Sequence, residues 1–192
     1  TVASGRDPYF FVAGGRTPSS YALGLSGVVG TEGAYLVNVR SVAVINEVAV
    51  DGVNTFVELA GPPGSPIGGY RLTLLDAVTG TQTANVVLPP ALTVGDSGLV
   101  VVAASATPAA DVVEAALAAS SRSFAVQLRD PTDRLVDALE VGGVGFGYGE
   151  GTPVAASGSH GVGRLMHLDI DENASDFVPA RFPTAGAENV PD

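Results

Sequence analysis

Four oxygen-bearing side chains near the C-terminus have the spacing of a metal-binding loop. Asp169, Asp171 and Asn173 alternate along the chain, and Asp176 follows three residues later. Carboxylate and amide oxygens this close together suit a hard cation such as Ca²⁺. The segment is not an EF-hand, because Ala stands at its sixth and twelfth positions, where that loop needs Gly and Glu. Asp and Asn also cap turns through their own backbone, so calcium binding and turn capping both remain open.

Side chains for covalent or phosphate chemistry are scarce. The chain has no Cys and no Lys, which excludes a thiolate nucleophile, a Cys-based zinc site and a P-loop. Ser159 and His160 are adjacent, so on a strand they would point apart, and they lie outside the Gly-x-Ser-x-Gly pattern of hydrolases. His160 and His167 are the only histidines, so a zinc site would also need carboxylates. The sequence therefore predicts a protein that is not an enzyme.

Two carboxylates fall on neighbouring strands of a predicted hairpin. Glu47 and Glu58 could in principle act as an acid and a base. We expect instead that they face solvent or pair with a guanidinium such as that of Arg71 or Arg129, because facing strands favour opposite charges.

A Gly-alternating run at 142–149 carries two aromatic residues, Phe146 and Tyr148. It lacks the dinucleotide-binding Gly spacing. The run either lets backbone segments pack closely or presents both rings to a protein or glycan.

Composition limits the partners of the chain. Its 192 residues fit one domain, or one domain plus an extension. Twenty acidic against nine basic residues give a net charge of −11, which disfavours nucleic acid and anionic membrane surfaces. No apolar run is long enough to cross a bilayer.

Val-rich runs separated by Gly, Pro and Asp predict short strands joined by turns. Residues 42–50 and 53–59 read as a hairpin with a two-residue turn at Asp51-Gly52. Further strands are expected at 70–75, 85–88, 99–103, 123–128 and 135–141. One helix is expected from Pro108 to about Ala119, capped by Thr107.

Four segments in order resemble a bacterial lamin-tail domain. They are Val44-Ile45-Asn46-Glu47-Val48 with Phe56-Val57-Glu58-Leu59, then Gly68-Gly69-Tyr70-Arg71-Leu72, then 126–131 with 135–138, and last the tail. The tail has Gly163-Arg164, the run from Asp169 to Phe177, and Pro183-Thr184-Ala185-Gly186 before Asn189. Tyr70, Glu172 and Ala185 depart from that pattern, which usually has Trp, Asp and Pro.

The resemblance implies an immunoglobulin-like β-sandwich spanning 41–192. The helix expected at 108–119 makes this an all-β fold with one short helical insertion, longer than the family pattern has there. It also implies a bacterial module that is secreted or on the cell surface. Residues 1–40 form a separate β-rich extension, which is either a partial repeat or a strand-exchange segment carrying Tyr9, Phe10 and Phe11.

Two functions follow from this reading. The first is an extracellular structural or adhesive module that binds a protein partner or further copies of itself, with Tyr9, Phe10, Phe11, Phe146 and Tyr148 as contacts. The second is an accessory domain of a larger secreted enzyme that binds calcium, a glycan or a peptide. Calcium is the one cofactor that the sequence suggests.

Overall fold

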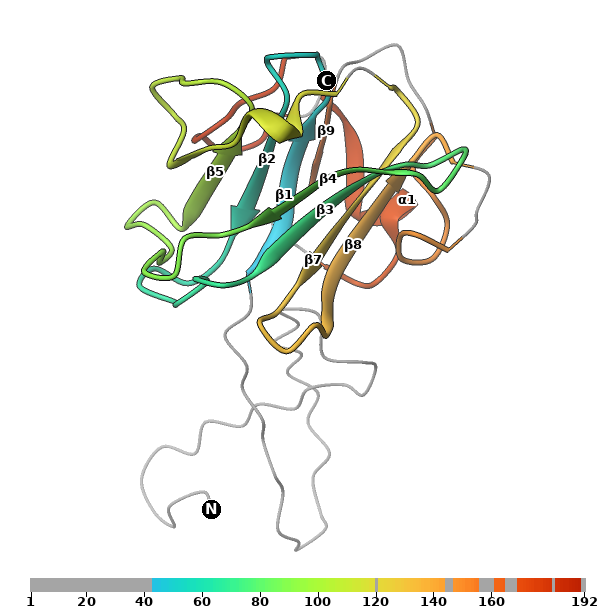
Figure 1. The fold of residues 1–192 in the computed structure, drawn as a ribbon. Helices are drawn as coiled ribbons and strands as arrows, with labels where there is room; N and C mark the ends of the chain where they lie inside the picture. Colours follow the sequence, from blue (N-terminus) through green and yellow to red (C-terminus); the bar gives the residue numbers. More distant parts are fainter. Residues whose placement is uncertain are drawn as a thin grey trace, which may run out of the picture.

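The computed structural model describes residues 43–119, 121–143, 147–155, 161–164, 169–180 and 182–190. These residues form two β-sheets that face each other across one apolar core (Figure 1). The first sheet has the strand order β10-β9-β1-β2-β5-β6, and the second has the order β4-β3-β7-β8. The predicted all-β sandwich is confirmed.

The bounds of the elements follow the Val-rich runs closely. The first sheet contains β1 (Val44–Ala49), β2 (Phe56–Ala60), β5 (Leu99–Ala103), β6 (Val112–Val113), β9 (Gly161–Arg164) and β10 (Phe177–Ala180). The second contains β3 (Arg71–Asp76), β4 (Gln82–Val87), β7 (Phe124–Arg129) and β8 (Leu135–Val141). All strand pairs are antiparallel except β5 with β6.

The core lies between the inner faces of the two sheets. Ile45 and Leu59 of the first sheet and Leu72, Leu128 and Leu139 of the second are all fully buried within it. In β4, buried Ala84 and Val86 alternate with exposed neighbours, as expected for a strand with one face toward solvent. The outer face of this second sheet is therefore partly open to a partner.

The first sheet is covered on both faces. Every residue of β1 and of β2 is buried. On its outer side a smaller apolar cluster of Ala49, Phe56, Val101 and Ala103 packs against Ala110 and Ala185. The segment after β5 and the C-terminal segment thus cover this face, which leaves the second sheet as the more exposed one.

The predicted helix at 108–119 is wrong. That segment contains β6 and a single 3₁₀ turn, η1 (Ala115–Leu117). β6 pairs in parallel with β5, and the carboxylate of Asp111 accepts a hydrogen bond from the Val101 amide, 2.8 Å away. The Ala content and the cap of this segment favour a helix locally, but the open edge of β5 offers backbone hydrogen bonds and apolar contact that outweigh local propensity.

The predicted two-residue turn between the first strands is also wrong. The last pair of the hairpin is Ala49 with Phe56, so six residues connect the strands. Gly52 does adopt the expected positive φ, +57°, but its amide donates to Ala119 O at 2.6 Å. Thr55 fixes the longer loop, since its hydroxyl donates to Gly52 O at 2.8 Å.

The described α-helix, α1 (Asn173–Asp176), is a single turn beside β8 (Figure 1). Among the described residues, no helix has the length and apolar character needed to cross a bilayer.

Candidate functional site

A buried guanidinium is the centre of the most charged part of the interior. Arg164 at the end of β9 is fully buried. Its Nη2 donates to both oxygens of Asp137 on β8, at 3.1 and 2.9 Å. Its Nη1 donates to Asp169 Oδ1 at 3.0 Å and to Asp176 Oδ2 at 3.1 Å. The side chain therefore joins β9, β8 and the segment that carries α1.

This network also closes the sandwich where β8 approaches β1. Arg164 Nε donates to Ile45 O at 2.8 Å, and the Ile45 amide donates to Asp137 Oδ2 at 2.6 Å. The guanidinium carbon lies 4.3 Å from the centre of the Phe177 ring, which adds a cation–π contact. An arginine can satisfy this many acceptors because its planar group has five N–H donors.

The four predicted calcium ligands surround this network in different roles. Asp169 and Asp176 bind Arg164, as described above, and Asp176 also accepts from the amides of Ile170 and Glu172. Asn173 Oδ1 accepts from the amides of Glu140 and Glu150, at 2.9 and 3.0 Å. Asn173 Nδ2 donates to Ala138 O at 2.8 Å. Asp171 has a positive φ of 60°, as Asp tolerates in turns. Calcium binding by these four residues stays a prediction.

The structure brings a different set of carboxylates together. Asp137, Glu150 and Asp169 each place one oxygen within 4.8 Å of the other two. Asp137 and Asp169 are buried, and Glu150 is half-buried in the loop at 147–155. Asp137 and Glu150 were not predicted as ligands. They are 13 residues apart, and Glu150 is 19 residues from Asp169, so only the fold makes the three carboxylates neighbours.

Two oxygens of this set lack hydrogen-bond partners. In the described part of the chain, Glu150 Oε2 and Asp169 Oδ2 are buried and accept no hydrogen bond. Burial, and next the charge of Asp137, raise the pKa of Glu150 to about 10 and that of Asp169 to about 7. Both groups therefore need a proton or a cation to be stable in the folded protein near neutral pH.

The expectation for Glu47 and Glu58 is wrong. Both side chains are buried, 1% and 0% exposed, and they are direct partners in the β1–β2 register. In place of arginines they bind the C-terminal segment. The Thr184 amide donates to both Glu47 oxygens, at 3.0 and 2.9 Å, and the Gly186 amide donates to Glu58 Oε2 at 2.6 Å.

This second polar network has its own electrostatic cost. Asn46 Nδ2 donates to Glu58 Oε1 at 2.6 Å, and Asn189 Nδ2 donates to Asn46 O at 3.1 Å. Burial raises the pKa of Glu47 to about 7, against the opposing effect of the Thr184 amide. Burial also raises the pKa of Glu58. Two carboxyls with raised pKa resemble an acid–base pair, but the C-terminal segment covers them, so they hold that segment in place.

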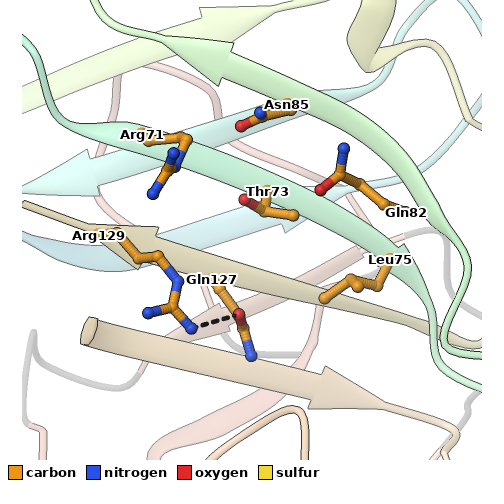
Figure 2. A pocket seen from close by; sticks show the side chains of 7 residues that line it. All are labelled: Arg71, Thr73, Leu75, Gln82, Asn85, Gln127 and Arg129. Carbon is orange, nitrogen blue, oxygen red and sulfur yellow. Dashed lines mark hydrogen bonds between the residues drawn. The ribbon is translucent and has the colours of Figure 1, made fainter. Parts of the chain in front are cut away.

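The outer face of the second sheet has a polar hollow of about 220 Å³. Figure 2 shows its side chains side by side on three strands: Arg71, Thr73 and Leu75 on β3, Gln82 and Asn85 on β4, and Gln127 and Arg129 on β7. We call this set the outer-face hollow. Its lining includes guanidinium, amide and hydroxyl groups, which can donate or accept hydrogen bonds.

Strand register produces the charge pattern of the outer-face hollow. Arg71 and Arg129 are direct cross-strand partners, and so are Thr73 and Gln127. Arg129 Nη2 donates to Gln127 Oε1 at 3.2 Å, and Arg71 forms an ion pair with Asp133. Glu47 and Glu58 were expected to face solvent or to pair with an arginine such as one of these two. Arg71 lies two residues from Thr73, and Arg129 lies two residues from Gln127, and this spacing of two was the available signal for one shared sheet face.

The predicted contact aromatics are only partly visible. Tyr9, Phe10, Phe11 and Phe146 lie outside the described residues, as do Ser159, His160 and His167. Tyr148 is half-buried, and its hydroxyl end lies against Gly80. Its carbonyl accepts from Gln127 Nε2 at 3.0 Å, so the loop that carries Glu150 also borders the outer-face hollow.

No family model matches this chain. A search of curated proteins likewise found no significant relative.

Proposed function

We propose that this chain is a non-catalytic extracellular structural or adhesive module that binds an acidic segment of a partner protein in the outer-face hollow. One observation carries the proposal. In a chain of net charge −11 with nine basic residues, Arg71 and Arg129 lie directly opposite each other on an open sheet face.

Charge complementarity defines the partner. Two guanidinium groups side by side attract carboxylates and can bind them through paired N–H···O bonds. The amides of Gln82 and Asn85 add donors and acceptors for the backbone of an extended segment. An Asp- or Glu-rich stretch of protein fits this combination better than an apolar or basic one.

Rigidity of the sheet also supports binding. Thr73, at the centre of the hollow, is 8% exposed and lies on the central strand β3, which pairs with β4 and β7. Side chains on a paired central strand lose little further freedom when a ligand binds, so less of the binding energy is lost to ordering. The secreted or cell-surface location is part of this proposal and comes from the family resemblance.

The test uses a peptide of eight glutamates as the probe and compares three proteins. These are the wild type, the double variant Arg71→Gln/Arg129→Gln, and the control Arg122→Gln, which removes a charge from an exposed residue that does not line the hollow. Hydrogen bonds to charged groups contribute about 1.5–3 kcal/mol each, so the double variant is expected to bind at least roughly tenfold more weakly. Amide NMR shifts should localise binding to β3 and β7 and weaken as salt is added.

Two results would contradict the proposal. One is equal peptide affinity in the wild type and the double variant. The other is an equal loss of affinity in Arg122→Gln, which would show a response to net charge alone. Sedimentation of the chain by itself at high concentration tests whether a second copy is the partner.

A further inference from the structure

The carboxylates beside Arg164 outnumber its positive charge. Asp137, Asp169 and Asp176 accept hydrogen bonds from Arg164, and Glu150 lies within 4.8 Å of Asp137 and Asp169. Four carboxylates against one guanidinium leave three excess negative charges when all are ionised. Buried charges without partners are strongly destabilising, so this cluster needs protons or further positive charge.

Two oxygens in the cluster are free to take a ligand. Asp169 is 3% exposed. Its Oδ1 is used by Arg164 and by the Asp171 amide, at 3.0 and 3.2 Å, while its Oδ2 is buried without a partner in the described residues. Glu150 Oε2 is buried and unpartnered in the same way. Native proteins rarely leave such acceptors unsatisfied, so these two atoms point to a missing group.

The chemistry and spacing of the donors select the kind of group. All three residues offer carboxylate oxygens, which hard cations prefer. Calcium–oxygen bonds of about 2.3–2.6 Å place ligands on opposite sides of the ion about 5 Å apart. The three oxygens lie within 4.8 Å of one another, so they can share one calcium ion without rearrangement. Magnesium needs shorter contacts in a near-ideal octahedron, whereas calcium accepts six to eight oxygens in a flexible arrangement, so further oxygens such as those of water complete its shell beside these three carboxylates.

We propose that Asp137, Glu150 and Asp169 form a calcium site that joins β8 to the loop at 147–155 and to the segment before α1. Arg164 occupies Asp169 Oδ1, so the ion binds the other oxygen, Oδ2. The ion reduces the excess charge of the cluster from three to one. It also holds the loop whose Tyr148 carbonyl accepts from Gln127 in the outer-face hollow. This site does not depend on the proposed function, because binding of the glutamate peptide is measured separately.

The experiment treats the whole chain with EDTA, removes the chelator, and titrates CaCl₂ by calorimetry and thermal unfolding. Controls use MgCl₂, and NaCl at equal ionic strength. We expect one calcium per chain. At calcium one hundred times its Kd, linkage predicts a Tm increase of about 5–10 °C for a domain of this size.

Three variants make the test specific. Glu150→Gln and Asp169→Asn are each expected to weaken calcium binding by roughly tenfold or more. Asp96→Asn removes an exposed carboxylate and should bind calcium like the wild type. In EDTA, Glu150→Gln should be at least as stable as the wild type, because it removes an uncompensated buried charge. With calcium present, the wild type should instead be more stable than Glu150→Gln. A purely structural role of Glu150 would not produce this reversal.

Two results would overturn the proposal. The first is a calcium titration that releases or absorbs no heat and raises the Tm no more than NaCl does, combined with an infrared band of a protonated carboxylic acid. The band would have to disappear in Glu150→Gln. That result would show that Glu150 keeps a proton and shares it with Asp137. The second is calcium binding that both Glu150→Gln and Asp169→Asn leave unchanged, which would place the ion elsewhere.

Discussion

Replacing Glu47 by Gln should remove the part of the protein's pH-dependent stability between about 5 and 8 that comes from Glu47. Burial raises the pKa of Glu47 from 4.5 to about 7. The folded protein therefore binds this proton more tightly than the unfolded chain does. The resulting stabilisation is fully present below pH 4.5 and is lost as pH rises through about 7. A difference of about 2.5 pKa units corresponds to about 3 kcal/mol.

The variant keeps the contacts of the native side chain. A glutamine can accept from the Thr184 amide through its Oε1, and its NH₂ can donate to the Thr184 hydroxyl, whose oxygen lies 3.3 Å from Glu47 Oε2 in the native structure. It carries no charge at any pH. We therefore expect Glu47→Gln to exceed the wild type by about 2–3 kcal/mol in unfolding free energy at pH 8, and by little at pH 4.5.

Urea unfolding of the wild type and of Glu47→Gln at several pH values measures this difference directly. Glu188→Gln is the matched control, since Glu188 is exposed on the same C-terminal segment. Subtracting the two curves removes the contributions of Glu58 and of the cluster around Arg164. Parallel pH profiles for the wild type and Glu47→Gln would refute the reasoning, as would a variant that is less stable at pH 8.

Two further substitutions probe the interior near β8. Arg164→Met should lower the unfolding free energy by about 3–5 kcal/mol, because it leaves buried carboxylates without their partner. In chemical denaturation this loss of stability should shrink toward low pH, because the carboxylates take up protons. A loss of the same size at low pH would contradict this account. Gly149→Ala should cost about 1–3 kcal/mol by the same measurement, because its Cβ would meet Asn173 Oδ1 and the Glu140 amide. Gly95→Ala, whose nearest neighbour would be 3.7 Å away, is the control, and equal costs would show that packing at residue 149 is not the cause.

Strand bounds were predicted best where an apolar strand pattern ended at residues typical of a turn. β7 and β8 lie within one residue of their predicted bounds at each end, and residues 130–134 form the turn between them. The structure shows why this turn is readable: Asp130 Oδ1 accepts from the amides of Thr132 and Arg134, at 2.9 and 3.0 Å. Such a turn is encoded by a few consecutive residues, so no distant segment is needed to form it.

Predictions failed where another segment of the fold changed the environment of a residue. The segment at 108–119 has helical propensity, but β5, about ten residues earlier, offers it an open edge. Glu47 and Glu58 have the residue type of a surface, but residues 184–189, far along the chain, cover them with amide donors. Residue type and local periodicity report on neither contact, because each depends on how the segments pack in the fold.

The residues that carry the lamin-tail resemblance form hydrogen bonds and ion pairs inside this structure. Asn46, Glu47 and Glu58 bind the C-terminal segment through Thr184, Gly186 and Asn189. Asp137, Asp169 and Asp176 bind Arg164. Each network ties together segments that are far apart in sequence, so these residue types are needed to close the sandwich whatever it binds. A match in them predicts a shared fold more strongly than a shared partner.

Under the proposed function, binding specificity comes from residues that take no part in these two networks. Arg71 and Arg129 face outward on the second sheet, and exchanging them would leave Arg164 and the C-terminal segment with their partners intact. The outer-face hollow can therefore vary while the fold is kept, as binding surfaces on a rigid scaffold do. For this reason the charge of that face, more than the Asp-rich segment before β10, is the feature from which the partner of such a module should be inferred.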